Sequence, residues 1–170
     1  IPFLSIEGIE ADDTIGSIAK WAEKEGSEVF ICSSDKDLCQ LVSEKIHIIH
    51  LHKDNLLIDK QKVKDQYGVE PAKIVDFLAI TGDTSDNIPG LEGFGPKTAS
   101  LLLNQYGSLE EILANSSKIK GKKGDTLIQQ KEVALMSKQL ARIDIQIEIP
   151  TQTSFFQLKH PSVPKVKRFF

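Results

Sequence analysis

Cysteine is scarce in this sequence, with only Cys32 and Cys39 among 170 residues. Two cysteines are too few for a framework of disulfide bonds, so both are expected to be reduced thiols. Cys32 lies in an apolar run, which predicts a buried position. The histidines and cysteines together show no spacing typical of zinc ligands, which argues against a zinc site. No stretch approaches the roughly 18 apolar residues of a membrane span, and the first residues do not resemble a signal peptide. We therefore expect neither a disulfide-stapled scaffold nor a membrane protein.

Basic charge is also in short supply, because the net charge is −3 and the isoelectric point is about 5.8. Proteins that bind nucleic acid usually carry an excess of Lys and Arg, so the net charge of the whole chain argues against that class. The distribution changes this interpretation. Acidic residues gather at 10–13, 35–37 and 83–86, whereas a lysine-rich segment covers 118–123. With 40% hydrophobic and 26% charged residues, the chain has the composition of a globular domain, in which grouped acids can form a metal site.

The first part of the chain alternates between helical and strand patterns. Apolar residues recur at helical spacing over 11–25, and acids in the first turn of this helix suit its dipole. A continuous apolar run at 29–32 predicts a strand buried on both faces. A second helix is expected at 34–42, followed by strands at 46–49 and 56–58. This alternation predicts a parallel α/β sheet, in which ligands bind beyond the carboxyl ends of the strands.

The second part of the chain is predicted to be mostly helical. The expected elements, in order, are a helix from Pro71 to about Ala79, a polar turn at 81–90, a helix from Pro96 that ends at Gly107, a short helix with a capping box of Ser108 and Glu111, a long helix at 125–141, a half-exposed strand at 143–149 and a short amphipathic helix at 161–170. We therefore divide the chain into an α/β core at 1–70 and a helical lobe with a return strand at 71–170.

The acidic clusters each lie at the expected end of a helix or strand, where side chains can reach a shared cleft. Taken alone, each cluster has a plainer explanation, because acids favour helix starts, cap helices and form turns. Three clusters that are predicted to meet are much less expected by chance. A divalent cation relieves the repulsion between grouped carboxylates, and two Mg²⁺ ions can activate a water and stabilise the leaving oxygen of a phosphodiester. The predicted ligands are Glu10, Asp12, Asp13, Asp35, Asp37, Asp83 and Asp86, and all except Glu10 are also candidate catalytic residues.

A glycine-rich turn follows the third acidic cluster. Gly93 and Gly95 let the backbone approach a phosphate closely, and the N-terminus of the next helix, with Lys97 and Thr98, offers N–H groups, charge and a hydroxyl. Such contacts hold DNA without reading its sequence. A plain tight turn is the alternative explanation, and a solvated loop is the alternative for the lysines. The lysines that would extend a phosphate track are Lys118, Lys120, Lys122 and Lys123.

Four motifs occur in an order that resembles the 5′–3′ exonuclease and flap endonuclease family, which includes the nuclease domain at the front of bacterial DNA polymerase I. The motifs are Glu10-Ala11-Asp12-Asp13, Ser34-Asp35-Lys36-Asp37-Leu38, Thr81-Gly82-Asp83-Thr84-Ser85-Asp86-Asn87-Ile88-Pro89-Gly90 and Gly93-Phe94-Gly95-Pro96-Lys97-Thr98-Ala99. The resemblance covers nearly the whole chain and is most specific over 81–99. It implies a parallel-sheet nuclease core of the PIN type and a helix-three-turn-helix lobe.

The resemblance also implies roles for the candidate residues. Glu10, Asp12 and Asp13 match acids of the first metal site, Asp83 and Asp86 match acids of the second, and Asp35 and Asp37 match acids close to both ions. Mg²⁺ is the implied metal, and Mn²⁺ is allowed in its place. The glycine turn matches the element that grips duplex DNA, and in this family that element often also binds K⁺. The implied activity is hydrolysis of DNA with 5′ ends or flaps, and of RNA primers, in the bacterial cytoplasm near the nucleoid.

The sequence departs from the family pattern at its start. Members begin earlier, with a strand that carries an essential Asp, another acid and a basic helical arch, and none of these is present here. We therefore expect a chain cut from a longer protein, with a polymerase domain in the same parent chain. The alternatives are a fragment that binds DNA without cleaving it, a stand-alone flap nuclease, and an acidic metal-binding protein with a structural role.

Overall fold

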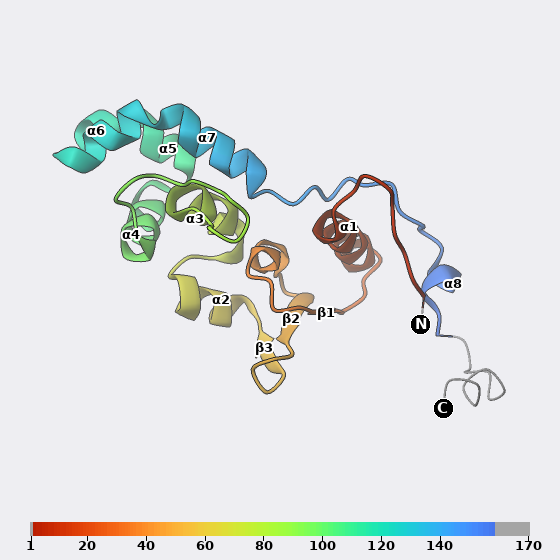
Figure 1. The fold of residues 1–170 in the computed structure, drawn as a ribbon. Helices are drawn as coiled ribbons and strands as arrows, with labels where there is room; N and C mark the ends of the chain where they lie inside the picture. Colours follow the sequence, from red (N-terminus) through yellow and green to blue (C-terminus); the bar gives the residue numbers. More distant parts are fainter. Residues whose placement is uncertain (1, 159–170) are drawn as a thin grey trace.

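The computed structural model describes residues 2–158 and consists of a small sheet flanked by a few helices, with a larger group of helices to one side of it (Figure 1). The first half contains α1 (Ala11–Lys24), β1 (Val29–Cys32), the 3-10 helix η1 (Asp37–Leu41), β2 (Ile46–His50), β3 (Leu56–Ile58) and α2 (Lys60–Tyr67). The second half contains η2 (Pro71–Lys73), α3 (Ile74–Thr81), α4 (Pro96–Tyr106), α5 (Leu109–Ala114), η3 (Ser116–Lys118), α6 (Lys122–Gln129), α7 (Lys131–Leu140) and α8 (Thr153–Phe156). No helix within this described part is long and apolar enough to cross a membrane.

The sheet is mixed, with strand order β1-β2-β3. β1 pairs with β2 in parallel, with Val29 opposite Ile46, as the sequence predicted. β3 pairs with β2 in an antiparallel register, with Ile48 opposite Ile58, so the expectation of a fully parallel sheet is wrong for this strand. The reason lies in the short connection between β2 and β3, because parallel strands need a crossover of about a dozen residues and a hairpin does not.

β1 is less buried than its apolar sequence indicated. Ile31 is buried, but Phe30 is 49% exposed and Cys32 is also exposed, so the prediction of a strand buried on both faces is wrong. β1 stands at the edge of the sheet and alternates its side chains between two faces. α1 packs against this strand, and the described residues cover only the face that carries Ile31.

Two elements that follow the strands differ in type from the expectation. The segment after β1 forms the short 3-10 helix η1 instead of an α-helix, because the chain must return to an extended conformation at Val42 to enter β2. α2 was not predicted, although Asp59 caps its start by accepting a hydrogen bond from the Lys62 N–H and Gly68 ends it in a left-handed conformation. The low apolar content of α2 concealed its helical pattern.

The helical half is organised around α3, whose side chains Ile74, Leu78, Ala79 and Ile80 are almost fully buried. α3 contacts α4, α5 and α7 in its own half and η1 in the other half. Lys138 on α7 ties these helices together: its Nζ atom lies 2.5 Å from Asp76 Oδ1 on α3 and donates hydrogen bonds to Glu110 on α5. This packing ties the first turn of α3 to α5 and α7.

The other predicted helices are mostly confirmed. α4 begins at Pro96 and is followed by its cap residue Gly107, and the Ser108 hydroxyl oxygen caps α5 by accepting a hydrogen bond from the Glu111 N–H. The single helix expected at 125–141 is wrong, since it divides at Gln130 into α6 and α7. The Gln130 side chain accepts a hydrogen bond from the Glu92 N–H, and the break lets α7 pack on α3 while α6 packs on η3.

The return segment after α7 runs in an extended form across α1, but it is not a strand, so the prediction for 143–149 is wrong (Figure 1). Its amides bond to side chains of a helix instead of to a neighbouring strand: the Asp144 N–H donates to Asp13 Oδ1 and the Ile147 N–H donates to Ser17 Oγ. The segment then enters α8, where Phe156 packs against Trp21. The amphipathic helix expected at 161–170 lies outside the described residues.

Candidate metal centre and nucleic-acid interface

The three acidic clusters converge on one cleft. The N-terminus of α1, the turn after β1 and the loop after α3 each deliver acids to it, and the start of the return segment closes one side. The cleft has a volume of about 290 Å³. Six of the seven predicted metal ligands line it, namely Glu10, Asp12, Asp13, Asp35, Asp37 and Asp86, and the seventh, Asp83, lies beside Asp37 and Asp86.

The loop after α3 is shaped to present two of these acids. Asp83 and Ile88 form an isolated antiparallel bridge with paired backbone hydrogen bonds of 2.9 and 2.7 Å. Gly82 and Gly90 both have positive φ, and their backbones pass so close together that a Cβ on Gly90 would stand 2.6 Å from the Thr81 carbonyl carbon. The two glycines therefore permit a turn too tight for other residues, and this turn aims Asp83 and Asp86 toward η1.

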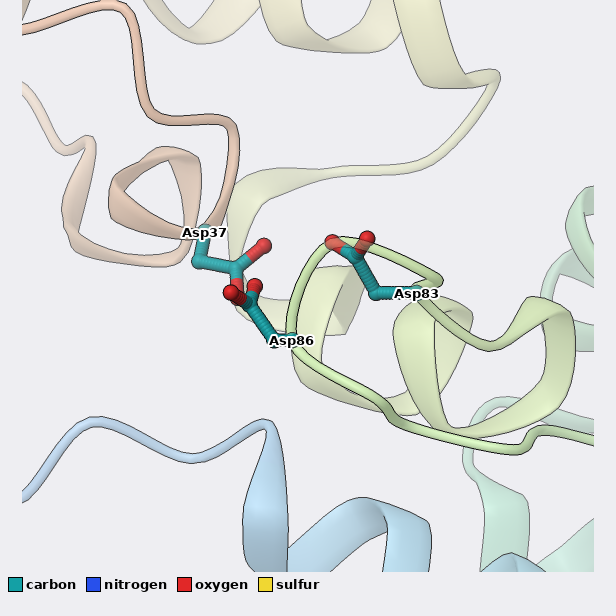
Figure 2. A group of neighbouring side chains, drawn as sticks. All are labelled: Asp37, Asp83 and Asp86. Atoms are coloured by element: carbon teal, nitrogen blue, oxygen red, sulfur yellow. The ribbon is translucent and has the colours of Figure 1, made fainter.

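Asp37, Asp83 and Asp86 form a close group, in which one carboxylate oxygen from each residue lies within 4.8 Å of those of the other two (Figure 2). Asp37 begins η1, and its backbone N–H donates to the Asp35 carboxylate at 2.9 Å. Asp83 is 3% exposed and Asp37 is 9% exposed, whereas Asp86 is exposed. Two buried carboxylates and one exposed carboxylate thus share a site that opens to solvent.

The electrostatics of the cleft show strain from grouped negative charge. Burial raises the pKa of Asp37 to about 7, and the neighbouring carboxylates of Asp35, Asp83 and Asp86 add to the rise. Burial, followed by repulsion from Asp35 and Glu10, also raises the pKa of Asp12. Burial alone would raise the pKa of Asp83 too, but the Lys36 ammonium and the Ser85 N–H outweigh it and lower that pKa.

The residues of the cleft fit a divalent cation on two grounds. Asp37 Oδ1 is buried and has no hydrogen-bond partner among the described residues, a costly arrangement unless the oxygen serves as a ligand. The donor set consists of carboxylate oxygens only, which hard cations such as Mg²⁺ prefer. One oxygen of Asp13 is already used, because Oδ1 accepts the Asp144 N–H at 2.8 Å. Asp13 therefore also anchors the return segment, a role that the sequence did not reveal.

The glycine turn and part of the lysine-rich segment form one surface. Gly93 has positive φ, and nothing lies within 4 Å of where a Cβ would stand on Gly93 or Gly95, so the turn has an uncovered outer face. Lys123 of α6 reaches this turn: its ammonium donates to Thr98 Oγ1 at 2.8 Å and lies 5.9 Å from the centre of the Phe94 ring. Lys97 is exposed at the start of α4.

The remaining predicted lysines lie in and around the connection between η3 and α6, because Lys118 ends η3 and Lys122 begins α6. Lys122 is exposed and lies 4.0 Å from Glu92, and Lys120 is exposed as well. Lys118 donates to Asn115. The structure thus joins Lys123 directly to Thr98, while the other three stand on the adjoining surface.

Two cations of the cleft were missed from the sequence. The Lys36 ammonium lies 2.5 Å from Asp83 Oδ2. Its place between Asp35 and Asp37 in the second motif was the sequence signal that could have indicated it. Arg142 lines the acidic cleft from the start of the return segment. No sequence signal marked Arg142, because the cleft wall it belongs to exists only after α7 has packed on α3.

Two family models match the chain in succession. The model described as "5′-3′ exonuclease, N-terminal resolvase-like domain" matches residues 1–68, and the model described as "5′-3′ exonuclease, C-terminal SAM fold" matches residues 69–164. A 5′-3′ exonuclease of Buchnera aphidicola is 42% identical over 166 residues, which cover 94% of this chain and 58% of that protein. The thermostable DNA polymerase I of Thermus aquaticus is 39% identical, over 98% of this chain and 20% of that protein.

Solved structures share the fold. A T5 5′-exonuclease structure with bound zinc superimposes with a TM-score of 0.75 at 24% identity, over 83% of this chain and 52% of that chain. The catalytic core of Rad2 in complex with DNA substrate superimposes with a TM-score of 0.59 at 16% identity, over 95% of this chain and 56% of that chain. The chain thus spans little more than half of the curated exonuclease and a fifth of the polymerase that it matches. Family models over 1–164 and relatives near 40% identity together show that the chain belongs to the 5′–3′ exonuclease family.

Proposed function

We propose that this chain forms the metal-binding and DNA-gripping part of a 5′–3′ exonuclease and structure-specific flap endonuclease. Its substrates would be DNA with 5′ ends or flaps and RNA primers paired to DNA, and the reaction would hydrolyse a phosphodiester bond. One observation carries the proposal: six acids from three separate parts of the sequence line one cleft, a seventh lies beside them, and a buried carboxylate oxygen of Asp37 has no hydrogen-bond partner among the described residues. Family membership supports the same reaction.

The acids would bind metal as two groups, one for each ion. Asp37, Asp83 and Asp86 would hold one divalent ion, and Glu10, Asp12, Asp13 and Asp35 line the part of the cleft suited to another. Mg²⁺ is the proposed metal, with Mn²⁺ as a substitute. Bound ions of this kind supply an activated water and stabilise the departing 3′-oxygen. Carboxylates whose positions are fixed by α1, η1 and the Gly82–Gly90 turn would keep the ligand geometry ready before substrate arrives.

The turn at Gly93 and Gly95 would grip the duplex away from the cleft. The uncovered backbone of the turn, the exposed Lys97 and the Lys123–Thr98 pair offer donors and positive charge to a DNA phosphate. Backbone oxygens of the same element would bind K⁺. The proposed division of labour places the nuclease core at 1–70 and the DNA-binding lobe at 71–170, and a polymerase domain is proposed in the same parent chain.

The test is cleavage of a 5′-labelled flap DNA in the presence of Mg²⁺. The control is the double variant Asp83→Ala/Asp86→Ala, which removes two carboxylates without touching the Gly93 turn. Cleavage by the unaltered chain and its loss in the variant would support the assignment. DNA binding by both proteins with no cleavage by either would instead indicate a fragment that grips DNA and is incompetent as a nuclease.

A further inference from the structure

A lysine ammonium stands inside the acidic cluster. Lys36 Nζ lies 2.5 Å from Asp83 Oδ2, and the carboxylates of Asp37 and Asp86 also face the ammonium closely enough to attract it. The Asp83 side chain is only 1% exposed, whereas the Lys36 side chain is 42% exposed. The lysine therefore reaches in from the solvent side, with part of its side chain exposed.

The hydrogen bonds of Asp83 show what this contact does. Asp83 Oδ1 accepts the Ser85 N–H at 2.9 Å, and Oδ2 forms an ion pair with Lys36. Neither Asp83 Oδ2 nor Asp37 Oδ1 receives a hydrogen bond among the described residues, but Asp83 Oδ2 has the Lys36 ammonium beside it. A cation held jointly by Asp37, Asp83 and Asp86 would have to share or take the oxygen that Lys36 now occupies.

We propose that Lys36 is a tethered counter-cation of this cluster, which neutralises Asp83 in the metal-free protein and is displaced when a divalent cation binds. The inference rests on the proposed metal site and assigns a further residue that tunes it. A charged side chain so close to the ligands competes with the metal for Asp83, and its positive charge repels the metal from the whole cluster. The same contact stabilises the metal-free fold, because a buried carboxylate without a partner is costly.

The two effects are thermodynamically linked. If metal binding displaces Lys36, then removal of the lysine must strengthen metal binding and weaken the metal-free fold at the same time. A lysine with a purely structural role predicts a different result: its removal would destabilise the protein and leave metal affinity unchanged or weaker. Metal affinity is therefore the readout that separates the two explanations.

The decisive comparison is Lys36→Met against Lys60→Met. Lys60 forms an exposed ion pair of similar length with Glu44, at 2.8 Å and away from the cleft, so it controls for the loss of one surface charge. We expect Lys36→Met to bind Mg²⁺ and Mn²⁺ about tenfold more tightly in isothermal titration calorimetry. In EDTA we expect its unfolding temperature to fall several degrees below that of Lys60→Met, and saturating Mg²⁺ to narrow that gap.

A second measurement on the unaltered chain avoids reliance on a variant. Labelling with an amine-reactive reagent, read by mass spectrometry of the peptide that contains Lys36, should rise when Mg²⁺ is added, while Lys60 labelling stays constant. Unchanged labelling, or metal affinity in Lys36→Met no higher than in Lys60→Met, would overturn the role of Lys36 while the metal site itself stands. Failure of both the unaltered chain and Lys36→Met to bind either metal would overturn the proposed function as well.

Discussion

Asp37 offers a quantitative test of the strain in the acidic cleft, through the substitution Asp37→Asn in metal-free protein. Asparagine keeps the shape of the side chain and removes its charge. Burial and the neighbouring acids raise the pKa of Asp37 from 3.8 to about 7 in the folded chain. The folded state therefore holds a proton that the unfolded state has already released, and stability falls as pH rises through this interval. Between pH 5 and pH 8 the free energy of unfolding therefore falls by about 3 kcal/mol. The fall takes place between pH 5 and the folded pKa near 7, at 1.36 kcal/mol per pH unit.

The pH range in which Asp37 lowers the free energy of unfolding differs from the range in which Asp83 acts. The pKa of Asp83 is lowered, so its contribution is lost only as pH falls below about 4, outside the range tested. The pKa of Asp12 is raised, so Asp12 adds to the loss in the same direction and persists in the variant. The assay is urea unfolding in EDTA at intervals from pH 5 to pH 8, for the unaltered chain and for Asp37→Asn.

The expected result is a steep decline of unfolding free energy with pH in the unaltered chain and a clearly shallower one in Asp37→Asn. The variant should be the more stable protein at pH 8. Saturating Mg²⁺ should reverse that order, because the ion stabilises only a chain with the full ligand set. Parallel pH profiles for the two proteins would refute the reasoning, since they would show that the Asp37 proton does not distinguish the folded from the unfolded state.

Other substitutions test the loop, the helical core and the DNA surface. Gly90→Ala should cost more than 3 kcal/mol in urea unfolding, because it combines positive φ with a clash against the Thr81 backbone, whereas Gly93→Ala, with positive φ and open space, should cost about 1 kcal/mol. Lys138→Met should lower the unfolding temperature by roughly 10 °C in calorimetry, because it leaves the 7% exposed Asp76 without its counter-charge; a drop below about 2 °C would contradict this. Lys97→Ala and Lys123→Ala should each weaken binding to duplex DNA of any sequence and reduce the salt dependence of log K by about 1 in fluorescence anisotropy, with Lys60→Ala as the unchanged control.

The sequence predicted the parts of the molecule that depend on local pattern. α1 with its acidic first turn, the capping of α5 by Ser108 and the glycine that ends α4 follow from residues that act within one turn of a helix. The acidic cleft was predicted for a related reason. Each of its acids stands at a recognisable start or end of a helix or strand, and the rule for α/β sheets places those after β1 at the ligand-binding edge.

Features that depend on contacts between distant segments could not be predicted from the local sequence pattern. The alternation at 143–149 has the period of a strand, but the hydrogen-bonding groups that met it were side chains of α1, such as Ser17. The break at Gln130 has no glycine or proline to mark it and results from the different partners of α6 and α7. β1 has the composition of a buried strand, yet Phe30 stands exposed, since composition does not specify which face receives a covering element.

The position of α3 explains how the fold can hold so many like charges in one place. Its apolar residues pack against both halves of the molecule, so the energy that anchors it comes from core burial and not from the cleft. The turn at its C-terminal end is fixed by Gly82, Gly90 and a hydrogen bond from the Gly90 N–H to the buried Ser137 of α7. Asp83 and Asp86 are therefore held near Asp37 by packing that repulsion between the acids cannot easily undo. A rigid support of this kind keeps the carboxylates close together in spite of their repulsion, and that closeness is the basis of the divalent-cation site that we propose.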